Sequence, residues 1–293
     1  MTGLVLAAVI VTNVTWYDAA RHREVPARIY APEVVSKPVP LIVFSHGLGG
    51  TRYGYSYLGQ YWASHGYISV HVQHAGSDGS IFNAAETLLA SARRAVAQPA
   101  NWRERPADVS FAITQMLHDP RVDTNAIGVA GHSFGAHTTL EIIGLHVAGE
   151  DFHDARVKAA VAMSSPRPRL PGALKDVKTP CMHLTGTKDD SPVFPTKPED
   201  RRYVFDHIDA PNQWLVTLKD AHHFTFSDNP RWEGRVVERD AHHQPWICEM
   251  TTKFWDAFLK RDTKAKMWLD GEGLKKLLQD QAVVEHKTER KAQ

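Results

Sequence analysis

The sequence predicts an α/β protein built on a mostly parallel central sheet of about eight strands, with helices on both faces and no large lid. Short apolar runs alternate along the chain with longer segments of helical periodicity, which is the order of a parallel sheet with crossover helices. The run Leu41–Phe44 is apolar at every position. Such a run is expected of a strand whose two faces are both buried.

The individual elements follow in chain order. The first two strands are separated by a polar turn and predict a hairpin. The third helix is expected to begin at Pro106, because proline favours the first turn of a helix. Strands are expected at 9–17, 25–30, 41–44, 67–72, 126–130, 157–163, 181–185 and 214–218. Helices are expected at 55–65, 84–97, 106–118, 134–145, 246–260 and 264–281, the last broken near Gly271 and Gly273.

The chain shows no sign of division into domains. Its 293 residues contain no internal repeat, no low-complexity segment and no linker rich in Gly, Ser or Pro. Although this length would allow two domains, single α/β domains often reach it. We therefore expect one domain over residues 1–293, in which residues 285–293 form a charged, frayed tail.

The composition is that of an ordinary soluble globular protein. Hydrophobic residues make up 43% and charged residues 23% of the chain, and the formal net charge is +1. A nearly balanced charge without a Lys/Arg stripe gives no electrostatic basis for nucleic-acid binding. Two cysteines cannot define a disulfide framework. No apolar run reaches the roughly 18 residues that span a bilayer.

The N-terminus contains an apolar run, Leu4–Val11, that is long enough for a short signal sequence. No Lys or Arg precedes this run, and no A-x-A-like cleavage site follows it. We interpret it as β structure, which favours a cytoplasmic protein. If it is instead the start of a chain that has already been trimmed, the protein could be secreted.

The strongest chemical signal is the segment Gly131–Gly135, with the sequence GHSFG. It follows the apolar strand expected at 126–130 and opens a helix, which is the strand–turn–helix context of a nucleophile elbow. The turn is so tight that residues two positions from the serine must lack a Cβ atom. The N-terminus of the following helix favours developing negative charge. Ser133 is therefore the expected nucleophile.

A serine nucleophile requires a base and an orienting acid, and after such an elbow the chain order is Ser, then Asp or Glu, then His. The base is expected after the last predicted strand, where His222 and His223 are adjacent. The acid is expected after the strand 181–185, where Asp189 and Asp190 are the candidates. The Gly-x-x-Asp spacing favours Asp189. Its carboxylate would hold the imidazole in the required tautomer and stabilise the cation.

Two backbone N–H groups are expected to stabilise the oxyanion that forms during attack. One belongs to Phe134, the residue after the nucleophile, and the other to the loop after the strand 41–44. That loop is His46–Gly50, and Leu48 is the expected donor. His46 is expected to brace the loop by hydrogen bonding rather than to act in catalysis.

Several segments resemble known enzymes. Phe44–Gly49, Ser64–Tyr67 and Gly131–Gly135 resemble the plasma-type platelet-activating-factor acetylhydrolases. The same segments resemble even more closely the bacterial proteins that are often labelled predicted dienelactone hydrolases. This second resemblance is strengthened by Gln73–Asp78 and Arg105–Phe111. The likeness runs from about Val25 to His223 and is most specific between Phe44 and Gly135.

This resemblance implies the α/β-hydrolase fold and the chemistry of a serine esterase. By the same likeness, Ser133, an aspartate and His223 form the triad, and Leu48 and Phe134 donate to the oxyanion. His223 is preferred to His222 because the phenylalanine that follows it is similar to the Ala-x-His-Phe pattern of several esterases and cutinases.

The chain departs from the acetylhydrolases at the orienting acid, which those enzymes carry directly after the strand that matches Ala159–Met163. Here Ser164–Pro166 stands at that place and cannot supply a carboxylate, so Asp189 is expected instead. The difference argues against carrying over the phospholipid specificity. True dienelactone hydrolases use a cysteine nucleophile, and Ser133 argues against that chemistry.

These residues predict a serine carboxylic-ester hydrolase that acts on short-chain acyl esters through an acyl-enzyme. The short interval between Ser133 and Asp189 leaves no room for a large lid, so we expect an open cleft and a small-molecule, lipid or polymer ester as partner. Alternatives of the same fold are a phospholipid acetylhydrolase, a lipase, a polyester depolymerase, an amidase and a thioesterase. A non-catalytic binding module is disfavoured because serine, aspartate and histidine are all present in the required order.

No cofactor and no metal ion are expected. The histidine pairs of the chain lack a full set of ligands at tetrahedral spacing, and there is no H-E-x-x-H motif. Neither a Walker A motif nor a G-x-G-x-x-G motif is present.

Overall fold

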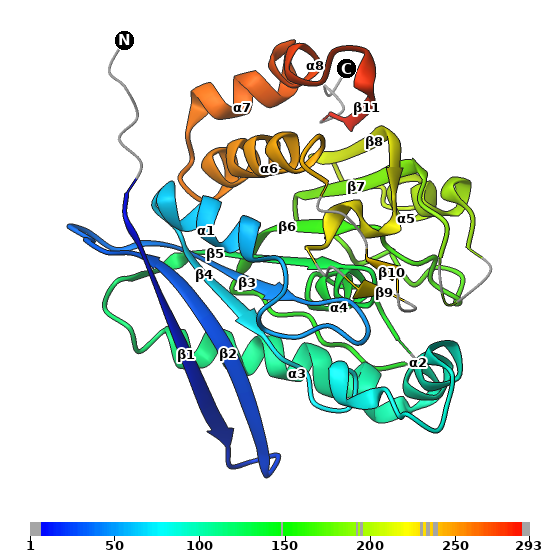
Figure 1. Cartoon of the computed structure of the whole chain (residues 1–293). Helices are drawn as coiled ribbons and strands as arrows, with labels where there is room; N and C mark the ends of the chain where they lie inside the picture. Colours follow the sequence, from blue (N-terminus) through cyan, green and yellow to red (C-terminus); the bar gives the residue numbers. More distant parts are fainter. Residues whose placement is uncertain are drawn as a thin grey trace.

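The computed structural model describes residues 7–147, 149–191, 193, 196–228 and 240–288, together with the backbone of 231–232 and 235–236. Its centre is a nine-stranded sheet with the strand order β1-β2-β4-β3-β5-β6-β7-β8-β11 (Figure 1). The strands of this sheet are β1 (Val9–Asp18), β2 (Arg23–Pro32), β3 (Val39–Ser45), β4 (Ile68–Val72), β5 (Val122–His132), β6 (Val157–Met163), β7 (Cys181–Lys188), β8 (Gln213–His222) and β11 (Ala282–Lys287).

The six central strands, β3 to β8, run parallel to one another, which confirms the predicted mostly parallel sheet. Antiparallel pairs occur only towards the two edges, where β1 pairs with β2, β2 with β4, and β11 with β8. The predicted hairpin is the pair β1 and β2. Every residue of β4 is buried, as expected of a strand covered on both faces.

Helices cover both faces of the sheet, as predicted. One apolar core contains Trp62, Trp214 and Trp255 and lies under α1, α6, α7 and α8. The other core lies under α3, α4 and α5. Figure 1 shows α1, α6 and α7 on one side of the sheet and α3 on the opposite side. The α-helices are α1 (Ser56–Ser64), α2 (Leu88–Ala97), α3 (Pro99–Met116), α4 (Phe134–Ile142), α5 (Tyr203–Asp206), α6 (Gln244–Phe258), α7 (Thr263–Asp270) and α8 (Gly273–Leu278).

Four short 3₁₀ segments complete the helical structure. They are η1 (Gly79–Ile81), η2 (Pro198–Arg202), η3 (His223–Phe226) and η4 (Gln279–Gln281). In the described part of the chain, none of the helices combines the length and the apolar character needed to cross a membrane.

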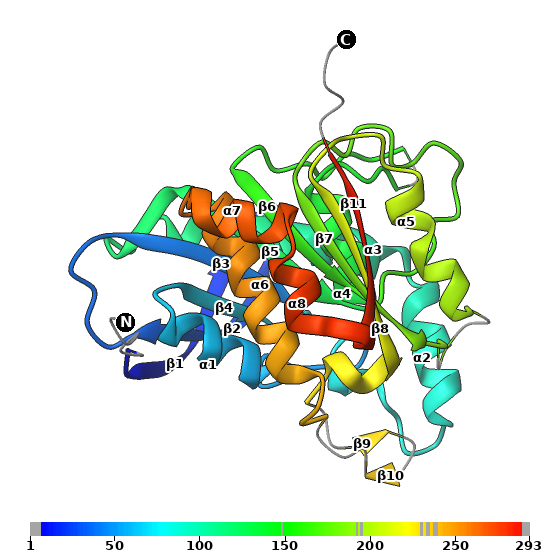
Figure 2. The same cartoon turned by 90° about the horizontal axis from the view of Figure 1, so that it is seen from above.

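The structure corrects two predicted boundaries. Helix α3 begins at Pro99 rather than at Pro106, which lies inside the helix; both prolines fit a helix start, and the earlier one occupies the first turn. The prediction of a frayed tail from residue 285 onward is wrong for residues 285–287. These residues belong to β11, which pairs with β8 (Figure 2). Residues 289–293 lie outside the described residues.

Sequence analysis did not predict β9 (Arg231–Trp232) and β10 (Arg235–Val236). The two strands pair with each other in a separate two-stranded sheet. Figure 2 shows them at the periphery, apart from the central sheet.

The parallel strands bring the loops after β3, β5, β7 and β8 to one edge of the sheet, where sites form in such folds. The tightest approach there is between α4 and the end of β3. A Cβ atom on Gly135 would overlap the carbonyl oxygen of Ser45, and one on Gly131 would overlap the carbonyl oxygen of Gly135. Neither glycine has a positive φ, so both are required by packing rather than by backbone conformation.

Replacement of Gly135 by alanine should lower the free energy of unfolding by about 3 kcal/mol or more, because the new Cβ would meet rigid backbone. Gly66 is the matched control. Its φ is +81° and nothing lies within 4 Å of a Cβ built on it, so Gly66→Ala should cost only about 1 kcal/mol for the left-handed backbone. Urea denaturation measures both changes, and equal losses would contradict the close contact between α4 and β3.

Candidate active site

Ser133 stands at the sharp turn between strand β5 and helix α4. Its φ of 55° and ψ of −117° lie outside the regions that residues with a side chain ordinarily adopt. Such strain is expected of a nucleophile elbow. The backbone N–H of Ser133 donates to the carbonyl of Met163 at 2.8 Å and so anchors the turn to β6. Ser133 is only partly buried, so part of the residue is exposed to solvent.

The imidazole of His223 lies beside this hydroxyl. Its Nε2 is 3.0 Å from Oγ of Ser133, and its Nδ1 is 2.9 Å from Oδ1 of Asp189. An Nδ1–H that donates to the carboxylate leaves Nε2 free to accept the serine proton. The neighbouring His222 is exposed, and its Nδ1 accepts a hydrogen bond from the amide of Phe224 instead.

Asp189 is fully buried directly after β7. Its Oδ1 meets His223, and its Oδ2 accepts a hydrogen bond from Oγ1 of Thr185 at 2.8 Å. The neighbouring Asp190 is exposed. The structure thus brings the three preferred site residues together and leaves Asp190 and His222 outside the cluster.

The two amides of the expected oxyanion hole lie in the loop after β3 and at the start of α4. Within the described residues, the N–H groups of Leu48 and Phe134 donate to no protein acceptor. Phe134 is the first residue of α4, so its N–H belongs to the unsatisfied first turn of that helix. The loop that carries Leu48 touches the elbow, because a Cβ on Gly47 would lie 3.2 Å from Nδ1 of His132.

A chain of hydrogen bonds links this loop to the base. The hydroxyl of Tyr55 accepts from the amide of Gly47 at 3.2 Å and donates to Nδ1 of His132 at 2.8 Å, and Nε2 of His132 donates to the carbonyl of His223 at 2.9 Å. Burial, and then the nearby His223, lower the pKa of His132 well below its ordinary value. His132 therefore stays neutral, as this chain of bonds requires. Sequence analysis did not predict these bonding roles of Tyr55 and His132, because no sequence motif marks a tyrosine at position 55.

The described part of the chain offers no group of three or more His, Cys, Asp or Glu side chains that could hold a metal ion. The groups that the structure brings together at this edge of the sheet are the side chains of Ser133, His223 and Asp189.

Comparisons with known proteins find similar sequences and a similar fold. A family model described as platelet-activating factor acetylhydrolase, isoform II, matches residues 8–102. The chain is 26% identical over 155 residues to a platelet-activating factor acetylhydrolase of Cavia porcellus. Its fold matches a ferulic acid esterase from Streptomyces cinnamoneus with a TM-score of 0.67 and 21% identity, over 89% of this chain and 92% of that one. The chain is therefore similar to platelet-activating factor acetylhydrolases over part of its length, and its fold is that of the α/β-hydrolases.

The sequence match covers only part of each protein. The aligned residues are 41% of this chain and 35% of the Cavia porcellus protein, so the chain matches about a third of that relative's length. The family match contains the loop His46–Gly50 and ends before Ser133. The structural match extends the shared fold over most of the chain.

In this protein a buried arginine contacts both the acid and the base. Nη2 of Arg201 lies 3.3 Å from Oδ1 of Asp189 and 3.2 Å from Nδ1 of His223. The other N–H groups of Arg201 donate to the backbone carbonyls of Ser164, Ser165 and Asp189 at 3.0 to 3.3 Å. Sequence analysis missed this residue, because it comes from the short segment η2 and belongs to no motif.

The charges around the imidazole favour an ionised acid and a neutral base. Burial acts to raise the pKa of Asp189, but the hydrogen bond and charge of His223 and the charge of Arg201 together lower it below its ordinary value. Burial lowers the pKa of His223; Asp189 opposes this change, and Arg201 adds to it. At neutral pH the imidazole is therefore ready to accept a proton.

The substitution Arg201→Gln should raise the pKa of the His223 imidazole, because it removes a cation that lies next to Nδ1. NMR titration of the imidazole signals measures the shift, and the spectrum of His223→Gln assigns the signal. Arg202→Gln is the matched control, because that neighbouring arginine pairs with Asp206 and Glu285 at the surface. An unchanged or lower pKa of His223 in Arg201→Gln would contradict this assignment of charge.

Proposed function

We propose that this protein is a serine carboxylic-ester hydrolase. The observation that carries the proposal is the continuous relay from Ser133 through His223 to Asp189, with distances of 3.0 Å and 2.9 Å. The relay begins at a partly exposed hydroxyl and ends at a fully buried carboxylate. The amides of Leu48 and Phe134, which have no protein acceptor among the described residues, supply the groups that would bind an oxyanion.

In the proposed mechanism, Oγ of Ser133 attacks the ester carbonyl carbon while Nε2 of His223 takes the hydroxyl proton. The carbonyl electron pair moves to oxygen, where the amides of Leu48 and Phe134 stabilise the charge. The bond to the alcohol then breaks, and the alcohol leaves with the proton from His223. Water that gives a proton to His223 attacks the acyl-enzyme, the carboxylic acid leaves, and Ser133 regains its hydroxyl proton.

We propose short-chain acyl esters as the substrates. Within the described residues, the chain between the end of α4 and the end of β7 contributes strands and loops but no helix. We infer that η1, α2 and the start of α3 cover the site, because Trp102 of α3 packs against Phe134 and Arg93 of α2 bonds to the carbonyl of Val193. A cover of this size is suited to a short acyl group and gives no basis for a long enclosed acyl tunnel.

A phospholipid acetylhydrolase is the second candidate, because the family match and the Cavia porcellus relative both bear that name. The position of the acid counts against it. The site that holds the acid in those enzymes is occupied here by Ser164 and Ser165, whose carbonyls bind Arg201. Asp189 on the next strand takes that role in the present proposal.

The wild-type protein should hydrolyse p-nitrophenyl acetate and butyrate faster than p-nitrophenyl octanoate, and a fluorophosphonate should label it. Ser133→Ala should lower kcat by about 10⁴-fold or more and abolish labelling, and Asp189→Asn should lower kcat by about 10⁴-fold. Asp190→Asn is the matched control and should stay close to the wild-type rate, because Asp190 is exposed and outside the cluster.

Each alternative result has a distinct meaning. A wild-type protein that neither turns over nor becomes labelled would contradict the esterase and favour a binding module. Faster hydrolysis of a phospholipid with a short acyl chain than of any nitrophenyl ester would support the second candidate. Labelling that persists in Ser133→Ala would show that another serine is the nucleophile.

The acid limb of the pH profile of kcat/KM should have its midpoint below pH 6.5, the ordinary pKa of histidine. His223 acts as a base only when it is neutral, and burial lowers its pKa. Activity is therefore present above this lowered pKa and is lost as the pH falls through it. Initial rates with p-nitrophenyl acetate in overlapping buffers measure the limb. A midpoint above 6.5 would mean that the hydrogen bond to Asp189 outweighs burial.

A further inference from the structure

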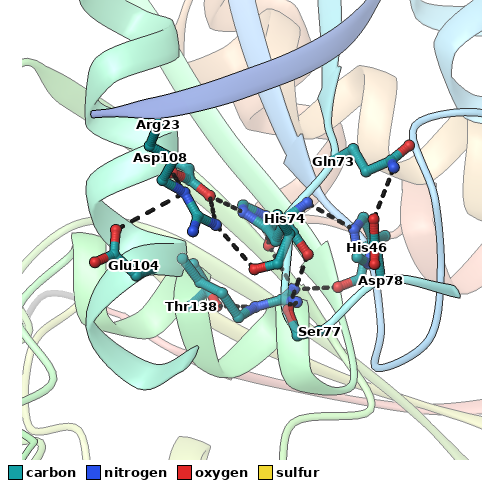
Figure 3. Close-up of polar contacts among 12 residues, drawn as sticks. Arg23, His46, Gln73, His74, Ser77, Asp78, Glu104, Asp108 and Thr138 are labelled. Atoms are coloured by element: carbon teal, nitrogen blue, oxygen red, sulfur yellow. Dashed lines mark hydrogen bonds and ion pairs between the residues drawn. The ribbon is translucent and has the colours of Figure 1, made fainter. Parts of the chain in front are cut away.

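A second serine–histidine–aspartate set lies in the interior of the protein. Oγ of Ser45 is 2.9 Å from Nε2 of His74. Nδ1 of His74 is in turn 3.0 Å from Oδ2 of Asp108 (Figure 3). The connectivity is that of a catalytic triad. However, no more than 1% of the surface of any of the three residues is exposed. A substrate cannot reach Ser45, so the role of this set is structural.

Arg105 on α3 joins this set to the surrounding loops. Its guanidinium donates to Oγ of Ser45 at 2.9 Å, to Oγ of Ser77 at 2.8 Å, to Oγ1 of Thr138 at 3.0 Å and to the carbonyl of His46. All four acceptors are neutral, and Arg105 is only 1% exposed. A buried cation without a direct carboxylate partner is costly, and an apolar side chain would serve packing better. Stability alone therefore does not explain this residue.

The same guanidinium holds both sides of the candidate oxyanion hole. On one side it binds the carbonyl of His46, two residues before Leu48. On the other side Thr138 accepts its Nε–H and donates its own hydroxyl proton to the carbonyl of Phe134 at 3.1 Å. The guanidinium carbon also lies 4.5 Å from the centre of the Phe134 ring. One side chain thus contacts the two segments whose amides must act together.

Two neutral histidines fix the loop after β3. The amide of His74 donates to Nε2 of His46 at 3.1 Å, and Nδ1 of His46 donates to the carbonyl of Gly47 at 2.7 Å. Figure 3 shows His74 between His46 and Asp108. Burial, and then the charge of Arg105, lower the pKa of each histidine well below its ordinary value. Both rings therefore keep one acceptor nitrogen, which these bonds require.

Asp108 connects this network to the β1–β2 hairpin. Its carboxylate accepts from Arg21 and Arg23 at 2.9 Å as well as from His74. Glu104, one turn earlier on α3, adds a second carboxylate for Arg21. The far side of His74 is thereby fixed to α3, the same helix that carries Arg105.

We propose that Arg105 is a positioning residue that sets the spacing between the backbone amides of Leu48 and Phe134. The proposal rests on the esterase function proposed above. Oxyanion donors act because they already lie where charge develops, so a small displacement of either amide reduces transition-state stabilisation. A planar guanidinium with five N–H donors, bound to both segments and held in the interior, keeps the two amides at a constant separation.

The sharpest test uses two neighbouring threonines of α4. Thr138→Val has nearly the same shape but lacks the hydroxyl that joins Arg105 to Phe134. Thr139→Val is the matched control, because Oγ1 of Thr139 is buried and has no hydrogen-bond partner among the described residues. Arg105→Lys is the conservative third variant, which keeps the positive charge and loses the planar guanidinium with its several N–H donors.

For each variant, kcat and KM for p-nitrophenyl acetate, the Ki of an aryl trifluoromethyl ketone and the melting temperature are measured. The hemiketal oxyanion of the ketone would occupy the same hole. Thr138→Val should lower kcat about tenfold at a nearly constant KM and raise the Ki by the same factor. Arg105→Lys should lose at least as much kcat. Thr139→Val should match the wild type in all these quantities.

Wild-type kcat and Ki in Thr138→Val would overturn the proposal, and so would a loss of kcat without a rise in Ki. Equal losses of kcat in the two threonine variants would mean that this part of α4 acts only through packing. That result would also contradict the proposal. A wild-type protein that neither hydrolyses the ester nor binds the ketone would instead refute the esterase function, together with everything that rests on it.

Discussion

The contact between helix α4 and the end of strand β3 is the constraint on which the candidate site depends. Gly135 lies so close to the carbonyl of Ser45 that a Cβ atom does not fit between them. This contact brings the first turn of α4 next to the loop after β3. The nucleophile at the elbow and both candidate oxyanion donors therefore owe their relative positions to one piece of backbone packing.

Buried arginines support that contact from two directions. Arg201 holds the acid and the base, and Arg105 holds the two segments of the candidate oxyanion hole. Both donate mostly to carbonyl and hydroxyl oxygens, and burial lowers the pKa of the histidines near them, His46, His74 and His223. Polar networks of this kind are costly when incomplete and rigid when every partner is present. We interpret both arginines as supports of geometry rather than as sources of stability.

Much of the fold and the site could be predicted, because the informative patterns are local. Apolar runs indicated the parallel strands, and the glycines around Ser133 indicated a tight turn before a helix. The features that were missed depend on contacts between distant segments. Strand β11 forms by pairing with β8, and neither Arg105 nor Arg201 carries a motif, because the function of a buried cation is set by the acceptors that fold around it.

The sequence by itself determined the succession of strands β1 to β8 and of most helices, the elbow, and the chain order of serine, aspartate and histidine, since these follow from periodicity, steric need and topology. It did not decide with certainty whether His222 or His223 is the base, or whether Asp189 or Asp190 is the acid. Only the tertiary structure separated the members of each pair, because neighbouring residues at a strand end face different surroundings. It likewise decided that the set around His74 is interior while Ser133 meets solvent, since accessibility is a property of packing and not of the residues themselves.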